Sequence, residues 1–266
     1  YRKDFGNTSF VLLPLPSASS FTNVGRIEIA IAPSDPNYVY LSIARQRTVS
    51  TTASGGGELC AFLVSDTKGS SWSSIALTSS QTDPMILGTA GFGDYANAIA
   101  VDPANKTKIY IGSESFYSWT QLPSNPLGQG TWSEVAFTSS PINFPFYVHS
   151  KIHDFKFDLV NPTLYIATDA GVYKSISSNT GFLSFNNGLN IAQYNSVTFP
   201  IYPRVNQGTP TNVAVPYAGV AGGTQGNSLT YLPGNLNTIQ TSNSFGSSNA
   251  YQSDFSKLSP KSIFYA

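Results

Sequence analysis

The sequence predicts an all-β fold, from a repeated phrase, a strand-type alternation within it and the lack of any long helix-type stretch. The phrase is an alternating apolar run, a turn with Pro or Asn, and then an aromatic strand that ends in small residues. It begins at Arg26, Asn97 and Lys151, returns with a longer turn at Tyr194 and starts again at Tyr251. Alternation with a period of two is typical of strands, so each copy predicts a hairpin. Recurrence every roughly 40–70 residues predicts a β-propeller of several four-stranded antiparallel blades.

The turns and the strands that follow them are predicted in the same order in successive copies. The first three hairpins turn at residues 33–37, 102–105 and 161–162, where Pro, Asn and Asp favour tight turns. A third strand is predicted at Leu59–Ser65 in the first copy and at Gly171–Ser175 in a later one. β-branched and aromatic residues are frequent in these segments, which favours strand over helix.

The composition limits the partners that the surface can bind. Of the 266 residues, 41% are hydrophobic and only 11% are charged, with 14 basic and 14 acidic side chains and a net charge of zero. Nucleic-acid binding needs a basic face, and the composition gives no sign of one, so no nucleic-acid partner is predicted. No apolar run approaches the roughly 18–20 residues of a membrane span, so none is predicted.

The surface composition and the single cysteine indicate a location. Cys60 is the only cysteine, so an internal disulfide cannot form, and its apolar neighbours predict a buried side chain. A surface rich in Ser, Thr and Asn but poor in charge is expected of a secreted or cell-surface protein. Low cysteine use favours a bacterial exterior over a disulfide-dense animal ectodomain.

Two predicted turns after third strands share a spacing from Ser to an aromatic residue. The residues that define them are Ser65, Gly69, Ser71 and Trp72 in the first turn and Ser175 and Phe182 in the second. A Ser side chain caps backbone amides, Gly permits a positive φ, and the aromatic ring packs the turn onto its blade, so a structural role is predicted. The first turn resembles a degenerate Asp-box (BNR) turn of pattern S-x-D-x-G-x-S/T-W, with Thr67 in the position of the Asp.

A longer resemblance extends from His149 to Asn227. The chain reads HSKIHDFKFD, LYIATDAGVYKS, FNNGLNIAQYNSV and AGGTQGN. These phrases are similar in order and spacing to Asp-box propellers of the sortilin and xyloglucanase-like type, which often read H-x-D-x-H, T/N-DGGVY-K/R-S, N-x-GL-x-x-x-Q-F/Y and GGTQDNG. Lys151 stands in place of the middle acid, and Ala170 in place of a Gly. The resemblance implies a propeller fold and this superfamily.

The number of repeats indicates a propeller that continues outside residues 1–266. About four hairpin repeats are followed by the start of another, which is incomplete at Ala266, and residues 10–15 read as the closing strand of an earlier blade. An open ring would expose edge strands. We therefore expect residues 1–266 to form a single propeller domain or a fragment of one, completed by the remainder of a longer polypeptide or by a protein partner.

Several polar and aromatic residues fall near predicted strand ends, where repeated blades bring equivalent positions to one face. The candidate ligand-binding residues are Asp94, Tyr95, Trp119, His149, His153, Asp154 and Gln225. Exposed aromatic rings stack on sugars or pack against partners, although packing between blades also explains the cluster around Trp119.

Catalytic and metal-binding motifs are not recognised in the sequence. His149 and His153 are the only histidines, and positions i and i+4 of a strand lie about 13 Å apart, from a rise of roughly 3.3 Å per residue. They therefore cannot share a metal ion unless the segment bends. No catalytic residue, metal or cofactor is predicted.

The leading expectation is a non-catalytic binding or scaffold module of a larger extracellular or cell-envelope assembly. The alternative is a glycoside hydrolase or a carbohydrate-binding propeller that acts on an extracellular polysaccharide, with a glycan as ligand and two facing carboxylates such as Asp94 and Asp154. A third hypothesis, a sortilin-like peptide receptor, would place its ligand in the central channel.

Overall fold

The chain divides into two compact units, residues 1–187 and residues 188–266. The computed structural model describes residues 1–14, 21, 23–47, 56–77, 83–87, 90–138, 141, 143–158, 160, 163–176, 181–187 and 189, and beyond these only the backbone of six strands. The described residues contain no helix with the length and apolar content that a membrane crossing requires. Each unit is treated by itself below.

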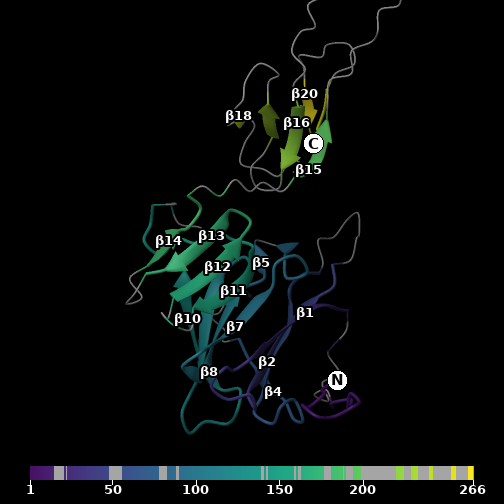
Figure 1. Cartoon of the computed structure of the whole chain (residues 1–266), viewed down its shortest axis with the longest axis vertical. Helices are drawn as coiled ribbons and strands as arrows, with labels where there is room; N and C mark the ends of the chain where they lie inside the picture. Colours follow the sequence, from purple (N-terminus) through teal and green to yellow (C-terminus); the bar gives the residue numbers. More distant parts are fainter. Residues whose placement is uncertain are drawn as a thin grey trace, which may run out of the picture. The chain divides into compact units, whose positions relative to one another are not determined.

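The first unit contains three four-stranded antiparallel sheets, each with its strands in chain order (Figure 1). The first sheet comprises β1 (Val24–Ile31), β2 (Val39–Arg45), β3 (Leu59–Ser65) and β4 (Ser73–Ile75). The second comprises β7 (Ala98–Asp102), β8 (Asn105–Gly112), β9 (Phe116–Gln121) and β10 (Gly130–Ala136). The third comprises β11 (Ile152–Asp158), β12 (Thr163–Thr168), β13 (Gly171–Ser175) and β14 (Phe182–Ser184). A short hairpin of β5 (Ile86–Leu87) and β6 (Ala90–Gly91) lies between the first and second sheets in the chain.

The second unit contains a fourth four-stranded sheet and a final hairpin. The sheet comprises β15 (Tyr194–Thr198), β16 (Val220–Thr224), β17 (Leu229–Leu232) and β18 (Gln240–Thr241), and the hairpin comprises β19 (Ser253–Phe255) and β20 (Ile263–Tyr265). The predicted repeats are thus confirmed as hairpins, and the all-β fold of four-stranded blades is confirmed with them. The strand expected at residues 10–15 is not formed by its described part, where only an isolated bridge joins Val11 to Arg2.

The three sheets of the first unit pack face to face in chain order, as successive blades of a β-propeller do. One buried cluster joins the first and second sheets and contains Tyr40, Phe62 and Trp119. A second cluster joins the second and third sheets and contains Phe116, Phe155 and Ile166. The first strand of each sheet contacts its neighbour, β1 with β7 and β7 with β11. We call β1, β7 and β11 the inner strands.

The first sheet has one face that the second sheet does not cover. Because residues directly opposite in antiparallel strands share a face, the register places Ile29, Leu41 and Leu63 together on it. Leu41, Ile43 and Leu63 form a third buried cluster, against which Phe21 and Trp72 pack. The isoleucines of β1 on the same face are largely exposed, with Ile29 at 61% and Ile31 at 57%.

Candidate functional site

A groove crosses the three inner strands of the first unit. Its volume is about 420 Å³. The side chains that define its character are Glu28, Ile29 and Ile31 from β1, Ile99 from β7, and His153 and Asp154 from β11. Each inner strand is an edge strand of its sheet. The groove therefore combines apolar side chains, a few polar groups and strand edges that have no partner within their own sheets.

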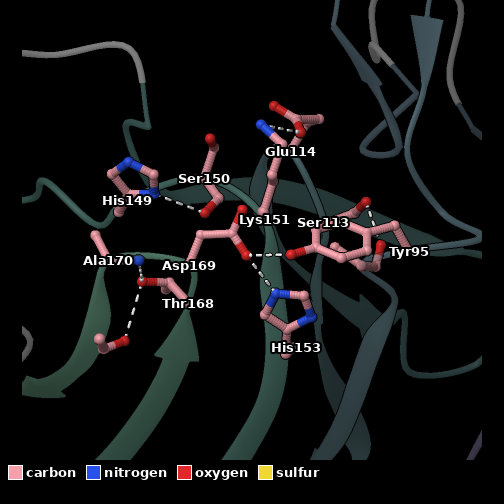
Figure 2. Close-up of polar contacts among 12 residues, drawn as sticks. Tyr95, Ser113, Glu114, His149, Ser150, Lys151, His153, Thr168, Asp169 and Ala170 are labelled. Atoms are coloured by element: carbon pink, nitrogen blue, oxygen red, sulfur yellow. Dashed lines mark hydrogen bonds and ion pairs between the residues drawn. The ribbon is translucent and has the colours of Figure 1, made fainter. Parts of the chain in front are cut away.

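His153 is held at this groove by a small polar cluster. Its Nε2 lies 2.7 Å from Oδ1 of Asp169, and the hydroxyl of Tyr95 donates to the same oxygen at 2.9 Å (Figure 2). The Tyr95 and His153 rings also meet edge to face, with centroids 4.9 Å apart. Asp169 has only 5% of its side chain exposed, so its two donors compensate for its burial. The described residues offer no hydrogen-bond partner to Nδ1 of His153, and this atom can contact a ligand.

An ion pair lies beside this cluster, between Lys151 and Glu114 (Figure 2). Lys151 Nζ lies 3.4 Å from Glu114 Oε1, and the two side chains are 14% and 2% exposed. Lys151 also lies over the ring of Phe92, at 4.8 Å from its centroid. Its backbone is left-handed, with φ of 58°, just before β11 begins. A buried carboxylate needs such a partner, so Lys151 has a structural role at the position where the resembling propellers carry an acid.

Asp94 and Tyr95 are adjacent in the chain, but only Tyr95 contacts β11, through the ring of His153. Asp94 Oδ2 lies 3.1 Å from Nε of Arg47, whose guanidinium lies 5.3 Å from the ring centroid of Phe92. The backbone carbonyl of Tyr95 accepts a hydrogen bond from Arg26 Nη1 at 2.6 Å. Asp94 therefore already has a cationic partner and does not line the groove, whereas Tyr95 supports His153.

The remaining predicted polar residues are not joined to this cluster. His149 Nδ1 lies 2.9 Å from the carbonyl oxygen of Ser150, before the strand begins. Asp154 accepts a hydrogen bond from the amide of Phe155, lies 3.6 Å from Lys156 and is 57% exposed. Gln225 lies outside the described residues. Within those residues, no group of three or more His, Cys, Asp or Glu side chains is placed to hold a metal ion.

Trp119 does not line a ligand site, which corrects the prediction for this residue. It is 1% exposed in the core between the first two sheets, and its ring meets that of Tyr40 at 6.4 Å in an edge-on arrangement. Trp119 instead packs between two blades, which is the alternative that the sequence analysis gives for this residue. The strand alternation places Trp119 on the same face as Tyr117 and Gln121, but it cannot show that another sheet covers this position.

The turn after β3 has the capping role that the sequence predicts. Ser65 Oγ accepts hydrogen bonds from the amides of Thr67 at 3.1 Å and Gly69 at 2.8 Å. Thr67 Oγ1 accepts one from the amide of Ser71 at 2.9 Å, so its hydroxyl serves as the acceptor where an Asp-box has a carboxylate. Gly69 has φ of 82°, and a Cβ there would lie 3.1 Å from the Trp72 ring. The turn therefore requires Gly at this position.

The corresponding residues after β13 behave differently. Ser175 Oγ accepts a hydrogen bond from the amide of Leu164 in the neighbouring strand, at 2.9 Å, rather than from the described amides of its own turn. Phe182 packs against Phe116 of the second sheet, with ring centroids 5.8 Å apart. Ser175 thus bonds to a neighbouring strand of its own sheet, and Phe182 packs against another sheet, which differs from the turn cap and the packing onto the same blade that the sequence predicts.

The comparisons with known proteins concern structure alone. No protein-family model matches the chain, and no curated protein matches it. Among solved structures, the GH74 xyloglucanase from Xanthomonas campestris matches with 14% identity and a TM-score of 0.40, over 88% of this chain and 34% of that chain. The structure of YCF48 bound to D1 peptide matches with 10% identity and a TM-score of 0.36, over 91% of this chain and 63% of that chain. YCF48 from Cyanidioschyzon merolae matches with 14% identity and a TM-score of 0.32, over 95% and 94% of the two chains. The chain thus spans about a third of the xyloglucanase and less than two thirds of the YCF48 chain in the peptide complex.

Proposed function

We propose that this chain is a non-catalytic binding and scaffold module of a larger extracellular or cell-envelope assembly, and that its groove holds an extended segment of a protein partner. The observation that carries the proposal is the groove across β1, β7 and β11. An extended peptide can add to an exposed strand edge, with its main chain supplying affinity and side-chain pockets supplying specificity. We also propose that the chain is a propeller of the Asp-box class and that it is exposed on a bacterial cell surface.

The chemistry of the groove favours a peptide with apolar side chains. Ile29 and Ile31 are exposed at its rim, and burying them against a partner would be favourable by about 25 cal/mol for each Å² of apolar surface removed from water. Glu28 and His153 offer polar groups at the same groove. A mixture of apolar surface and a few placed polar groups is typical of protein-binding surfaces.

The bonding of the acids supports a non-catalytic role. Glu28 accepts a hydrogen bond from Arg26 at 2.7 Å, Asp94 is paired with Arg47, and Asp169 is shared by His153 and Tyr95. Each of these three carboxylates therefore already has a bonding partner within the chain.

Site-specific photo-crosslinking tests the proposal in cells that make the protein naturally. A benzophenone amino acid is placed at Ile29, and the matched control carries it at Leu183, which is 50% exposed on β14 and does not line the groove. We expect the variant with the crosslinker at position 29 to give a discrete protein adduct, and the variant with it at position 183 to give none. Equal adducts from both positions, or none from Ile29, would contradict the proposal.

The second candidate function is glycoside hydrolysis, because two carboxylates from different strands, Glu28 and Asp154, line one groove. An inverting glycosidase uses an acid and a base roughly 6.5–9.5 Å apart. Under this alternative, Glu28→Gln and Asp154→Asn would each abolish release of reducing sugar from a polysaccharide panel while leaving the thermal midpoint unchanged. Full activity in both variants, or no activity in the unmodified chain, would dismiss it.

A further inference from the structure

A second cavity, of about 220 Å³, lies between the second and third sheets, away from the groove. One wall comes from β8, β9 and β10, and the other from the segment around Phe146 together with Ser175, Gly181 and Phe182. The cavity and the groove have no lining residue in common. Its volume is below the roughly 300–1,000 Å³ of pockets for drug-sized ligands, which limits an occupant to about one ring.

A row of polar side chains crosses the first wall. Tyr110 pairs with Ser118, and Ser118 pairs with Ser133, so the three residues lie in line across β8, β9 and β10 on one face. Ser118 is only 8% exposed, lines the cavity, and has no side-chain hydrogen bond to any described residue. This hydroxyl can therefore form a hydrogen bond to a ligand in the cavity.

Aromatic rings form the rest of the cavity. Tyr110, Phe146 and Phe182 line it, and the amide of Phe182 donates to the carbonyl of Pro145 at 2.7 Å, which ties the two parts of the second wall together. Gly181 has φ of 145°, and a Cβ there would lie 2.3 Å from the Pro145 oxygen. The second wall can therefore approach this closely only because residue 181 is glycine.

One cation and one anion line the same cavity. Lys108 Nζ lies 5.0 Å from the ring centroid of Tyr110, and Glu134 lines the cavity from β10. Burial raises the pKa of Glu134 and also that of Tyr110, so the tyrosine keeps its hydroxyl proton at neutral pH. The lining thus contains no cluster of like charges that would select an anion or a cation, and the register pairs Glu134 with Tyr117, on the other face of the sheet from Ser118.

We propose that this cavity binds a single neutral sugar ring, such as the terminal monosaccharide of a glycan. A pyranose presents apolar C–H groups on its faces and hydroxyls around its rim. Its faces match the rings of Tyr110, Phe146 and Phe182, and its hydroxyls match the Oγ atoms of Ser118 and Ser133. The site does not depend on the groove, so a failure of either proposal leaves the other standing.

Saturation-transfer difference NMR on the full chain tests the site with free D-glucose, D-galactose, D-mannose, D-xylose and N-acetyl-D-glucosamine at millimolar concentration. We expect transfer to the ring C–H protons of at least one sugar. Ser118→Val puts two methyl groups in place of the hydroxyl, and loss of this one ordinary hydrogen bond should weaken the binding roughly two- to tenfold. Ser74→Val is the matched control, because Ser74 is exposed on β4 and outside the cavity.

The outcomes separate clearly. No transfer to any of these sugars overturns the proposal, and so does equal binding by the unmodified chain and Ser118→Val. Transfer to indole, added as an aromatic probe, with none to the sugars also overturns it. If Ser118→Val lowers the thermal midpoint, Ser133→Ala serves in its place, because Ser133 is less buried than Ser118 and its hydroxyl is part of the same row.

Discussion

The two faces of the first sheet carry similar side chains but have different surroundings. Toward the second sheet, Tyr40 and Phe62 are at most 1% exposed and pack with Trp119 in one cluster. On the other face, Leu41 and Leu63 are buried, yet Ile29 of the same row is 61% exposed. The difference shows that strand alternation assigns a residue to a face, whereas a neighbouring sheet decides whether that face is core or surface. Four substitutions test this comparison, in order of decreasing effect.

The largest effect is expected for Phe62→Ala, on the covered face. Phe62 packs between the sheets and meets the ring of Trp132 at 5.5 Å, so its removal leaves a cavity. We expect the free energy of unfolding to fall by about 3–5 kcal/mol, measured by chemical denaturation. A loss below about 1 kcal/mol would mean that the first two sheets do not pack as described.

An intermediate effect is expected for Ser65→Ala, which changes the turn at the end of β3. The substitution leaves the amides of Thr67 and Gly69 without their acceptor. Loss of a comparable capping side chain destabilises by about 0.5–2 kcal/mol. Thermal or chemical denaturation measures it, with Ser74→Ala as the exposed control. Equal stabilities of the two variants would show that the Ser65 cap contributes nothing.

A small effect is expected for Ile29→Ala, on the uncovered face. Because most of this side chain is already in water, we expect the free energy of unfolding to change by no more than about 0.5 kcal/mol. Chemical denaturation of the isolated chain measures the change beside Phe62→Ala. A loss above about 2 kcal/mol would reveal that this face is covered in solution.

The smallest effect is expected for the ion pair between the turn of the first hairpin and β8. Lys106 donates to Asp35 at 2.8 Å, which lowers the pKa of Asp35 and raises the pKa of Lys106. A lowered carboxyl pKa adds stability above the unfolded value, roughly 3.9, which is lost as the pH falls through the folded pKa. A raised Lys pKa adds stability below roughly 10.4, which is lost as the pH rises through the folded pKa.

The contribution of this pair is therefore greatest between these limits. Asp35→Asn should narrow the difference in thermal midpoint between pH 7 and acid, roughly pH 3, relative to the unmodified chain. Added salt should also narrow this difference in thermal midpoint for the unmodified chain, but by less, because salt screens the partly exposed ion pair without removing it. An unchanged pH profile in Asp35→Asn would mean that the contact is not formed in solution.

Much of the fold could be predicted because its signals are local. Residues 33–37 form the turn between β1 and β2, where Asp35 Oδ1 accepts from the amide of Asn37 at 3.1 Å. Leu59–Ser65 and Gly171–Ser175 are strands with the predicted bounds. Alternation, turn residues and aromatic spacing all act over a few neighbouring positions, so they can be read along the chain.

The candidate site could be predicted only in part. Tyr95 and His153 were expected near one face, and the structure joins them through Asp169, which lies 74 positions from Tyr95 and 16 from His153 in the chain. The partner of Lys151, Glu114, comes from the loop before β9, 37 positions earlier in the chain. A lysine with a left-handed backbone is unusual, yet φ is not visible in a sequence.

The sequence by itself determined the β class, the repeated hairpins and the capped turn at Ser65, because each depends on interactions between residues close together in the chain. Only the tertiary structure decided that Trp119 is core while Ile29 is surface, that Asp94 faces Arg47, and that Ser118 borders a cavity. Each of these follows from how segments far apart in the chain pack against one another. Such packing joins positions tens of residues apart, and alternation within a strand carries no information about what lies opposite.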